Sequence, residues 1–220
     1  MFFLPIGCLI FVAFILFVPI LFALGYFQVV TWGFENLGIP PSVTLIILLL
    51  ILFGSAVNIP LGKPKLFYVQ KYRFFGLWKT PKIEAQGVAI NLGGAAIPIA
   101  ISFYFLFTVW QQGFDLQPIL IATLAMMVLA KFLSRVIPGT GISISALVPP
   151  IFSAILALIL APDYPAVCAF IAGTLGVLIG ADILNLPKII KYGGFVSIGG
   201  AGVFDGIFLV GIVSALLAGF

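Results

Sequence analysis

Long apolar segments that carry almost no charge constrain this chain more than any other feature. Hydrophobic residues make up 63% of its 220 residues, charged residues make up 7%, and the mean hydropathy is +1.34. A soluble chain of this length surrounds its core with charged side chains, and too few are present here to do so. We therefore predict one all-α integral membrane domain over residues 1–220, with the lipid bilayer as its main partner and the plasma membrane as its location.

Seven apolar segments are candidate membrane spans, at roughly 20 residues per crossing helix. They cover about residues 3–29, 42–58, 92–110, 116–136, 145–161, 165–186 and 201–219. With this division all 10 Lys and Arg residues fall on one side, and Glu35, Asp115 and Asp163 fall on the other. The positive-inside rule then predicts a multi-pass protein with a cytoplasmic N-terminus. The net charge of +4 is attributed to this orientation, and no nucleic-acid partner is expected.

The single long connection, about residues 59–91, mixes six basic residues with aromatic ones. We expect it in the cytoplasm at the membrane interface, as a β-hairpin or as an amphipathic helix, because its periodicity leaves both open. A membrane anchor is favoured over a partner-binding site, since Lys, Arg and aromatic side chains are typical of the interface.

A short internal repeat runs through the predicted spans. SAVNIPL at residues 55–61 resembles DILNLPK at 182–188, and INLGGAA at 90–96 resembles VSIGGAG at 196–202. Both pairs run in the same direction, which predicts two parallel three-helix units joined by a fourth span, a 3+1+3 arrangement. Ser55 then corresponds to Asp182, and Ile99 corresponds to Asp205.

Asp182 and Asp205 are the candidate functional residues, because an ionised carboxylate inside an apolar span is costly unless something compensates it. Both fall near the cytoplasmic ends of predicted spans six and seven, so we expect them to face each other as a dyad. Close carboxylates can share a proton and so supply one acid and one base. The predicted supporting residues are Asn185, Lys131, Arg135, Gly199, Gly200 and Gly202.

Two structural interpretations compete with a functional dyad. Lys131 and Arg135, four residues apart on one face of predicted span four, could neutralise an aspartate as a packing ion pair. Asp205 could instead cap the N-terminus of span seven. The chain has no histidine and two cysteines, which leaves zinc, haem and iron–sulfur centres without a ligand set. No metal or cofactor is therefore predicted.

Three motifs carry a resemblance to a known family. PGTGISISALVPP from Pro138, GADILNLP from Gly180 and SIGGAGVFDGIFL from Ser197 resemble the signature of a prokaryotic polytopic membrane family catalogued as a domain of unknown function. The likeness covers nearly the whole chain and implies no activity. A remoter similarity is to the presenilin-type intramembrane aspartyl proteases, which place two catalytic aspartates on neighbouring spans. In those proteins the second aspartate follows Gly-x-Gly, whereas Phe204 precedes Asp205 here. The Ser-Ala-Leu stretch at 145–147, which resembles their Pro-Ala-Leu motif, lies before the aspartates and not after them.

Three functions remain open at this point. The first is a membrane hydrolase in which Asp205 as base and Asp182 as acid activate water against an amide of a membrane-peptide substrate. The second is a proton- or cation-coupled transporter or channel in which the same aspartates bind a small cation and broken helices at the glycine pairs complete the site. The third is a structural or assembly protein. The distances between Asp182, Asp205 and Lys131 would distinguish them.

Overall fold

The described part of the chain is mainly helical, with several short strands. The computed structural model describes residues 24, 25, 27, 28, 30–62, 65–73, 78–137, 141–191, 195–200 and 206–219. Most of the first predicted span therefore lies outside the described residues. The strands correct the prediction of an all-α fold, and they confirm the hairpin alternative for the long connection.

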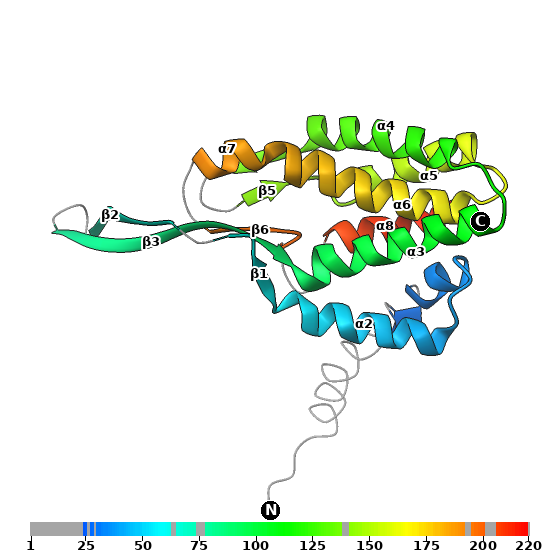
Figure 1. The fold of residues 1–220 in the computed structure, drawn as a ribbon, viewed down its shortest axis with the longest axis horizontal. Coiled ribbons are helices and arrows are strands. Elements are labelled where there is room, and N and C mark those ends of the chain that lie inside the picture. The colour runs from blue at the N-terminus through cyan, green and yellow to red at the C-terminus, as the bar shows by residue number, and fades with distance from the viewer. Residues whose placement is uncertain are drawn as a thin grey trace, which may run out of the picture.

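Six helices form the body of the molecule and run roughly along its long axis (Figure 1). They are α2 (Pro41–Ser55), α3 (Ile97–Gln111), α4 (Gln117–Leu133), α5 (Val148–Leu160), α6 (Pro165–Val177) and α8 (Gly206–Ala218). Helix α6 lies in the middle of this body, in contact with α3, α4, α5 and α8. Its residues from Cys168 to Thr174 are all buried, which makes α6 the centre of the core.

Two helical stretches are long and apolar enough to cross a membrane, Leu92–Gln111 with 20 residues and Pro165–Ile190 with 26. The helices α2, α4, α5 and α8 have 15, 17, 13 and 13 residues. At ~1.5 Å per residue such helices are roughly 20–26 Å long, which is short of the ~30 Å hydrocarbon core of a bilayer. The predicted spans from 42–58 onward each contain a helix, but the structure does not establish seven crossings.

Small residues allow α6 and α4 to approach closely. A Cβ added at Gly176 would lie 2.5 Å from the Cβ of Met126, and one added at Gly180 would lie 2.9 Å from the Cβ of Ala130. Glycines four residues apart on one helix face are the usual device for close packing of apolar helices. The approach extends beyond α6, because the next stretch, residues 178–182, also lies against α4 and carries Asp182.

A small mixed sheet lies at one end of the helices. It contains β1 (Asn58–Pro60), β2 (Lys65–Arg73), β3 (Trp78–Asn91) and β6 (Phe195–Ile198). Strands β1 and β2 pair with β3 antiparallel, whereas β6 pairs with β3 in parallel, with Gly87 opposite Phe195. The outer part of the β2–β3 hairpin extends away from the helical body (Figure 1).

A second, two-stranded hairpin follows α4. Strands β4 (Arg135–Ile137) and β5 (Gly141–Ser143) pair antiparallel, and the residues between them lie outside the described part of the chain. Strand β4 starts only two residues after α4 ends, because Ser134 adopts an extended conformation with ψ 140°. Arg135 therefore does not share a helix face with Lys131, which corrects that expectation.

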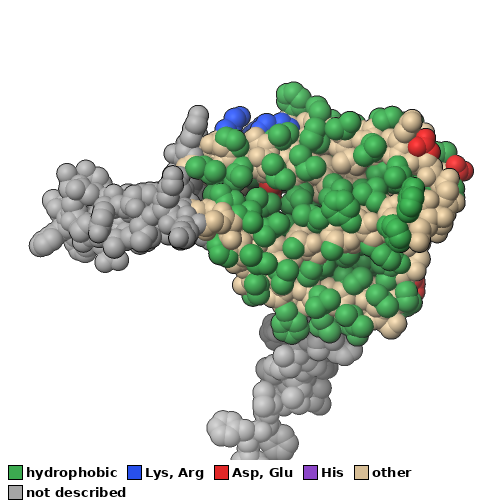
Figure 2. Space-filling model, viewed as in Figure 1, with side chains coloured by type: hydrophobic (Ala, Val, Ile, Leu, Met, Phe, Trp, Pro, Cys, Tyr) green, Lys and Arg blue, Asp and Glu red, His purple; other side chains and the backbone are tan. Residues whose placement is uncertain are grey.

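Apart from Asp182, the charged side chains of the described helices and of β4 separate to the two ends of the helical body. Figure 2 shows basic side chains gathered at the end near α7 (Leu186–Lys191) and acidic ones at the opposite end, with apolar side chains over the surface between them. The connectivity agrees, since α4 begins just after Asp115 and has Lys131 in its last turn, and the helical stretch Pro165–Ile190 begins just after Asp163 and contains Lys188 near its end.

Candidate functional site

Asp182 lies where a long helix changes its hydrogen-bond pattern. It ends the π-helix η2 (Leu178–Asp182), which is followed by the 3-10 helix η3 (Ile183–Asn185) and then by α7. Pro187 has no N–H to donate to the Ile183 carbonyl, and the Leu186 N–H takes that carbonyl instead. Such local changes of pitch are frequent at functional sites, and this one presents Asp182 beside the β6–α8 connection.

The Asp182 carboxylate binds the backbone of Gly199. The Gly199 N–H donates to Asp182 Oδ2 at 2.8 Å. Gly199 has φ +72°, and a Cβ at this position would lie 2.7 Å from the carbonyl oxygen of Gly94. Only glycine satisfies both conditions, because other residues are strained at positive φ and would collide with Gly94. The conformation of Gly199 is therefore what positions the N–H toward Asp182.

Next to the Asp182–Gly199 hydrogen bond, side-chain hydrogen bonds join β1, β3 and β6 to the end of α2. We call this region, with Gly199, the glycine junction. Asn91, which is 3% exposed at the end of β3, accepts from the Gly94 N–H at 2.8 Å through its Oδ1. Its Nδ2 donates to the Ser55 carbonyl at 2.8 Å and to Asn58 Oδ1 at 3.1 Å. The Ser197 hydroxyl also donates to Asn58 Oδ1. Buried polar groups satisfied in this way fix one arrangement of the surrounding backbone.

Lys131 binds a different part of the broken helix. Its Nζ donates to the Leu184 carbonyl at 2.5 Å and to Asn185 Oδ1 at 2.6 Å. Asn185 in turn donates through Nδ2 to Ser134 Oγ at 2.7 Å and to the Ala181 carbonyl at 2.8 Å. The ammonium thus binds a backbone carbonyl at the change of helix type, and no ion pair with Asp182 forms within the described part of the chain.

The predicted site residues fall into four groups. Asp182 is hydrogen-bonded to Gly199, while Lys131 is hydrogen-bonded to Asn185 and, among the described residues, makes no ion pair with Asp182. Arg135 is exposed on β4, and Gly200 follows Gly199 at the start of the connection to α8. Asp205 and Gly202 lie outside the described residues, so the dyad stays a prediction.

Three residues of the junction were not among the predicted site residues: Asn58, Asn91 and Ser197. The available signal was an amide or hydroxyl inside each of the otherwise apolar repeat motifs. Those motifs served only to align the two copies, and nothing in a single sequence indicates that the three side chains meet. Within the described residues, no group of three His, Cys, Asp or Glu side chains is arranged to hold a metal ion.

The fold defines a class of predominantly helical protein with a small mixed sheet and two helices of membrane-crossing length. Residues 52–217 match the family described as "Protein of unknown function (DUF1614)", and the chain belongs to this family. The match confirms the resemblance to a domain of unknown function. Searches of curated proteins and of solved structures return no match.

Proposed function

We propose that the protein is a multi-pass membrane protein in which Asp182 binds a proton or a small cation, as part of a transporter or channel. The observation that carries this proposal is the state of the Asp182 carboxylate. It sits at a helix break and receives one backbone N–H, and within the described residues no Lys or Arg pairs with it. An anionic group in apolar surroundings without a counter-charge is a natural cation site.

Membrane insertion is supported by the surface of the helices. Large apolar side chains point outward on several of them, among them Phe53 on α2 (71% exposed), Ile159 on α5 (71%) and Phe132 on α4 (82%). Continuous exposed apolar surface of this kind needs a lipid or protein partner. With basic side chains at one end and acidic ones at the other, the positive-inside rule puts the Lys131 end in the cytoplasm.

The parallel repeat is supported by matching contacts in its two copies. Asp182 corresponds to Ser55, and Gly199 corresponds to Gly93. Asp182 binds Gly199, and Ser55 packs on Gly93, where an added Cβ would lie 2.8 Å from Ser55 Oγ. Parallel repeats with interrupted helices at their interface are a recurrent plan of transporters. The second copy differs in carrying a carboxylate where the first carries a hydroxyl.

Engagement of Lys131 elsewhere favours cation binding over a packing ion pair. Its ammonium is held by the Leu184 carbonyl and the Asn185 amide, so it does not neutralise Asp182. A lysine that paired with the carboxylate would compete with any incoming cation, and the observed arrangement removes that competition.

A di-aspartyl hydrolase is the second candidate, and one contact favours it. A hydrogen bond to Asp182 holds Gly199 beside the first aspartate. The segment that follows Gly199 in the sequence leads to Asp205, immediately before α8. Two carboxylates close to one water would activate it against an amide of a membrane peptide, as in the intramembrane aspartyl proteases that the sequence resembles.

The test is cation flux in proteoliposomes that contain the full chain. We expect wild-type protein to dissipate a proton, Na⁺ or K⁺ gradient and Asp182→Asn to reduce the rate at least ~10-fold, because the amide cannot exchange a proton or balance a cation. Asp163→Asn, which changes an exposed acid at the opposite end, is the matched control and should retain the flux.

Two further results would redirect the proposal. If wild-type protein moves none of these ions but cleaves a membrane peptide, and Asp182→Asn and Asp205→Asn both abolish cleavage, the hydrolase is correct. If neither activity appears in vesicles that contain folded protein, both proposals fail in favour of a structural role.

A further inference from the structure

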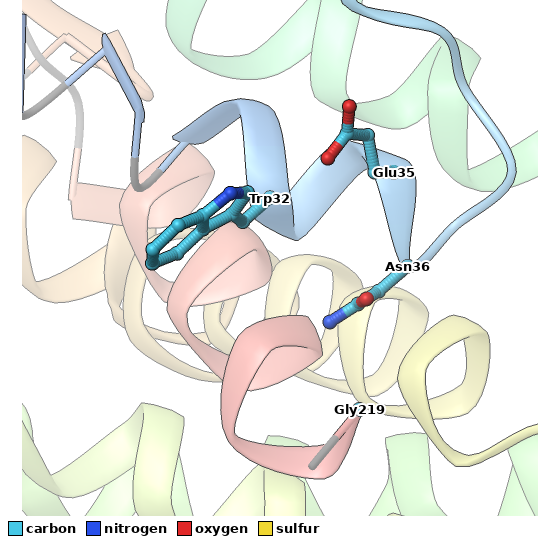
Figure 3. Close-up of a pocket in the computed structure, with 4 residues that line it drawn as sticks. All are labelled: Trp32, Glu35, Asn36 and Gly219. Carbon is cyan, nitrogen blue, oxygen red and sulfur yellow. The ribbon is translucent and has the colours of Figure 1, made fainter.

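A small pocket lies at the end of the molecule opposite Asp182. Its volume is about 200 Å³, and it is lined by Trp32, Glu35, Asn36 and Gly219 (Figure 3). The first three residues come from one stretch at the end of the helical segment 30–35, and Gly219 follows the last turn of α8. The pocket therefore belongs to neither the glycine junction nor the Lys131 network.

The pocket wall is held rigidly against α8. Phe34 is completely buried, and Gly33 is so close to α8 that an added Cβ would lie 2.9 Å from a methyl group of Ile212. These contacts fix one face of the helical segment and leave Trp32 and Glu35 on its open side. Residues three apart on a helix are neighbours on its surface, so the indole and the carboxylate border the same space.

The charge of the pocket points to a positively charged ligand. Glu35 is exposed and has no cationic partner within the described residues. Asp115 and Asp163 stand shortly before α4 and α6, at the end of the body where α8 ends, whereas Lys131, Arg135 and Lys188 belong to the far end of α4, to β4 and to α7 (Figure 1). Trp32, with 50% of its surface accessible, adds an aromatic side chain to the lining of the same pocket.

We propose that this pocket binds a small organic ammonium group, of the choline or ethanolamine kind. An aromatic face attracts a cation through its quadrupole, and an adjacent carboxylate supplies the opposite charge. The Asn36 amide, which faces Gly219, offers a hydrogen-bonding group on the far wall. A volume below the ~300–1,000 Å³ of drug-sized sites suits a small headgroup. The ammonium can belong to a free amine or to a phospholipid headgroup, since the recognised chemistry is the same.

The experiment uses Trp32 fluorescence in the full chain. Trp78→Phe and Trp110→Phe leave Trp32 as the only tryptophan, and the protein is held in a maltoside detergent that has no ammonium group. We expect choline chloride to change the fluorescence saturably, NaCl at equal ionic strength to do nothing, and 3,3-dimethylbutanol, an uncharged analogue of choline, to do nothing. Glu35→Gln should weaken choline binding at least ~10-fold.

Asp163→Asn changes another exposed acid at the same end and is the matched control. This variant should bind choline as the parent does, with the same melting temperature.

Experiments in nanodiscs distinguish the two sources of the ammonium. If a lipid headgroup is the ligand, phosphatidylcholine or phosphatidylethanolamine discs shift the Trp32 emission and abolish the response to free choline, whereas phosphatidylglycerol discs do neither. If a free amine is the ligand, choline titrates equally in all three. A response that never saturates, or one that Glu35→Gln leaves unchanged, overturns the proposal.

Discussion

Gly93 is a position at which a single methyl group decides the packing of two elements. An added Cβ would overlap the Ile51 carbonyl oxygen and lie 2.5 Å from the Ser55 backbone nitrogen. Both neighbours are backbone atoms of α2 and cannot rotate away, so Gly93→Ala should destabilise the protein by ~1–3 kcal/mol. Thermal unfolding in detergent measures this. Gly25→Ala is the control, because a Cβ at Gly25 meets nothing within 4 Å. Equal melting temperatures for the two variants would contradict the close approach.

Lys131 provides a second prediction at the residue scale, through a double-mutant cycle. Lys131→Met and Asn185→Leu should show a coupling of about 1 kcal/mol, because the two side chains share a hydrogen bond of 2.6 Å. Lys131→Met and Asp182→Asn should be additive, since the ammonium is bound elsewhere. Chemical unfolding of the four variants in each cycle gives both numbers. Strong coupling between Lys131 and Asp182 would restore the packing ion pair and remove the basis for a cation site.

The elements show which parts of the fold a single sequence can predict. The apolar segments located six of the helices, because a run of apolar residues between polar breaks is a local signal. The predicted span at 145–161 was longer than α5, because the apolar residues before that helix lie in a loop. The parallel pairing of β6 with β3 left no local trace, because it joins segments far apart in the sequence. Asp182 and Gly199 were both predicted as site residues, whereas the hydrogen bond between them could not be predicted, because it depends on that pairing.

The β2–β3 hairpin leads to a prediction at the element scale. Residues 65–73 pair only with 78–86, and β3 meets β1 and β6 only from Gly87 onward. Replacing residues 66–85 by Asn-Gly, a two-residue hairpin turn, should therefore leave the fold intact, with a melting temperature within roughly 4 °C of the parent. Circular dichroism during heating tests this.

Ala89→Lys is the contrasting variant, because Ala89 is 0% exposed and lies between β1 and β6. It should lower the melting temperature far more than loss of the whole hairpin tip. A shortened chain that fails to fold would show that the hairpin supports the body.

At the scale of the whole molecule, the separation of charge predicts how the chain lies in a membrane. Single cysteines at Asp115 and Asp163 should react with an impermeant maleimide from outside the cell, and those at Arg135 and Lys188 only after permeabilisation. All four positions are exposed. Cys8→Ser provides the background, and the completely buried Cys168 should stay unreactive. Labelling of Asp163 and Lys188 positions from the same side would exclude the proposed orientation.

The β3–β6 pairing also has a consequence for synthesis on the ribosome. Gly87 emerges about a hundred residues before its partner Phe195, so one edge of β3 stays open while the helices between them are made. At ~5–20 residues per second this interval lasts roughly 5–20 s. An open strand edge invites pairing with another nascent chain. We therefore expect the growing chain to need a chaperone or rapid folding of the later segments, so that this edge is covered before another chain pairs with it.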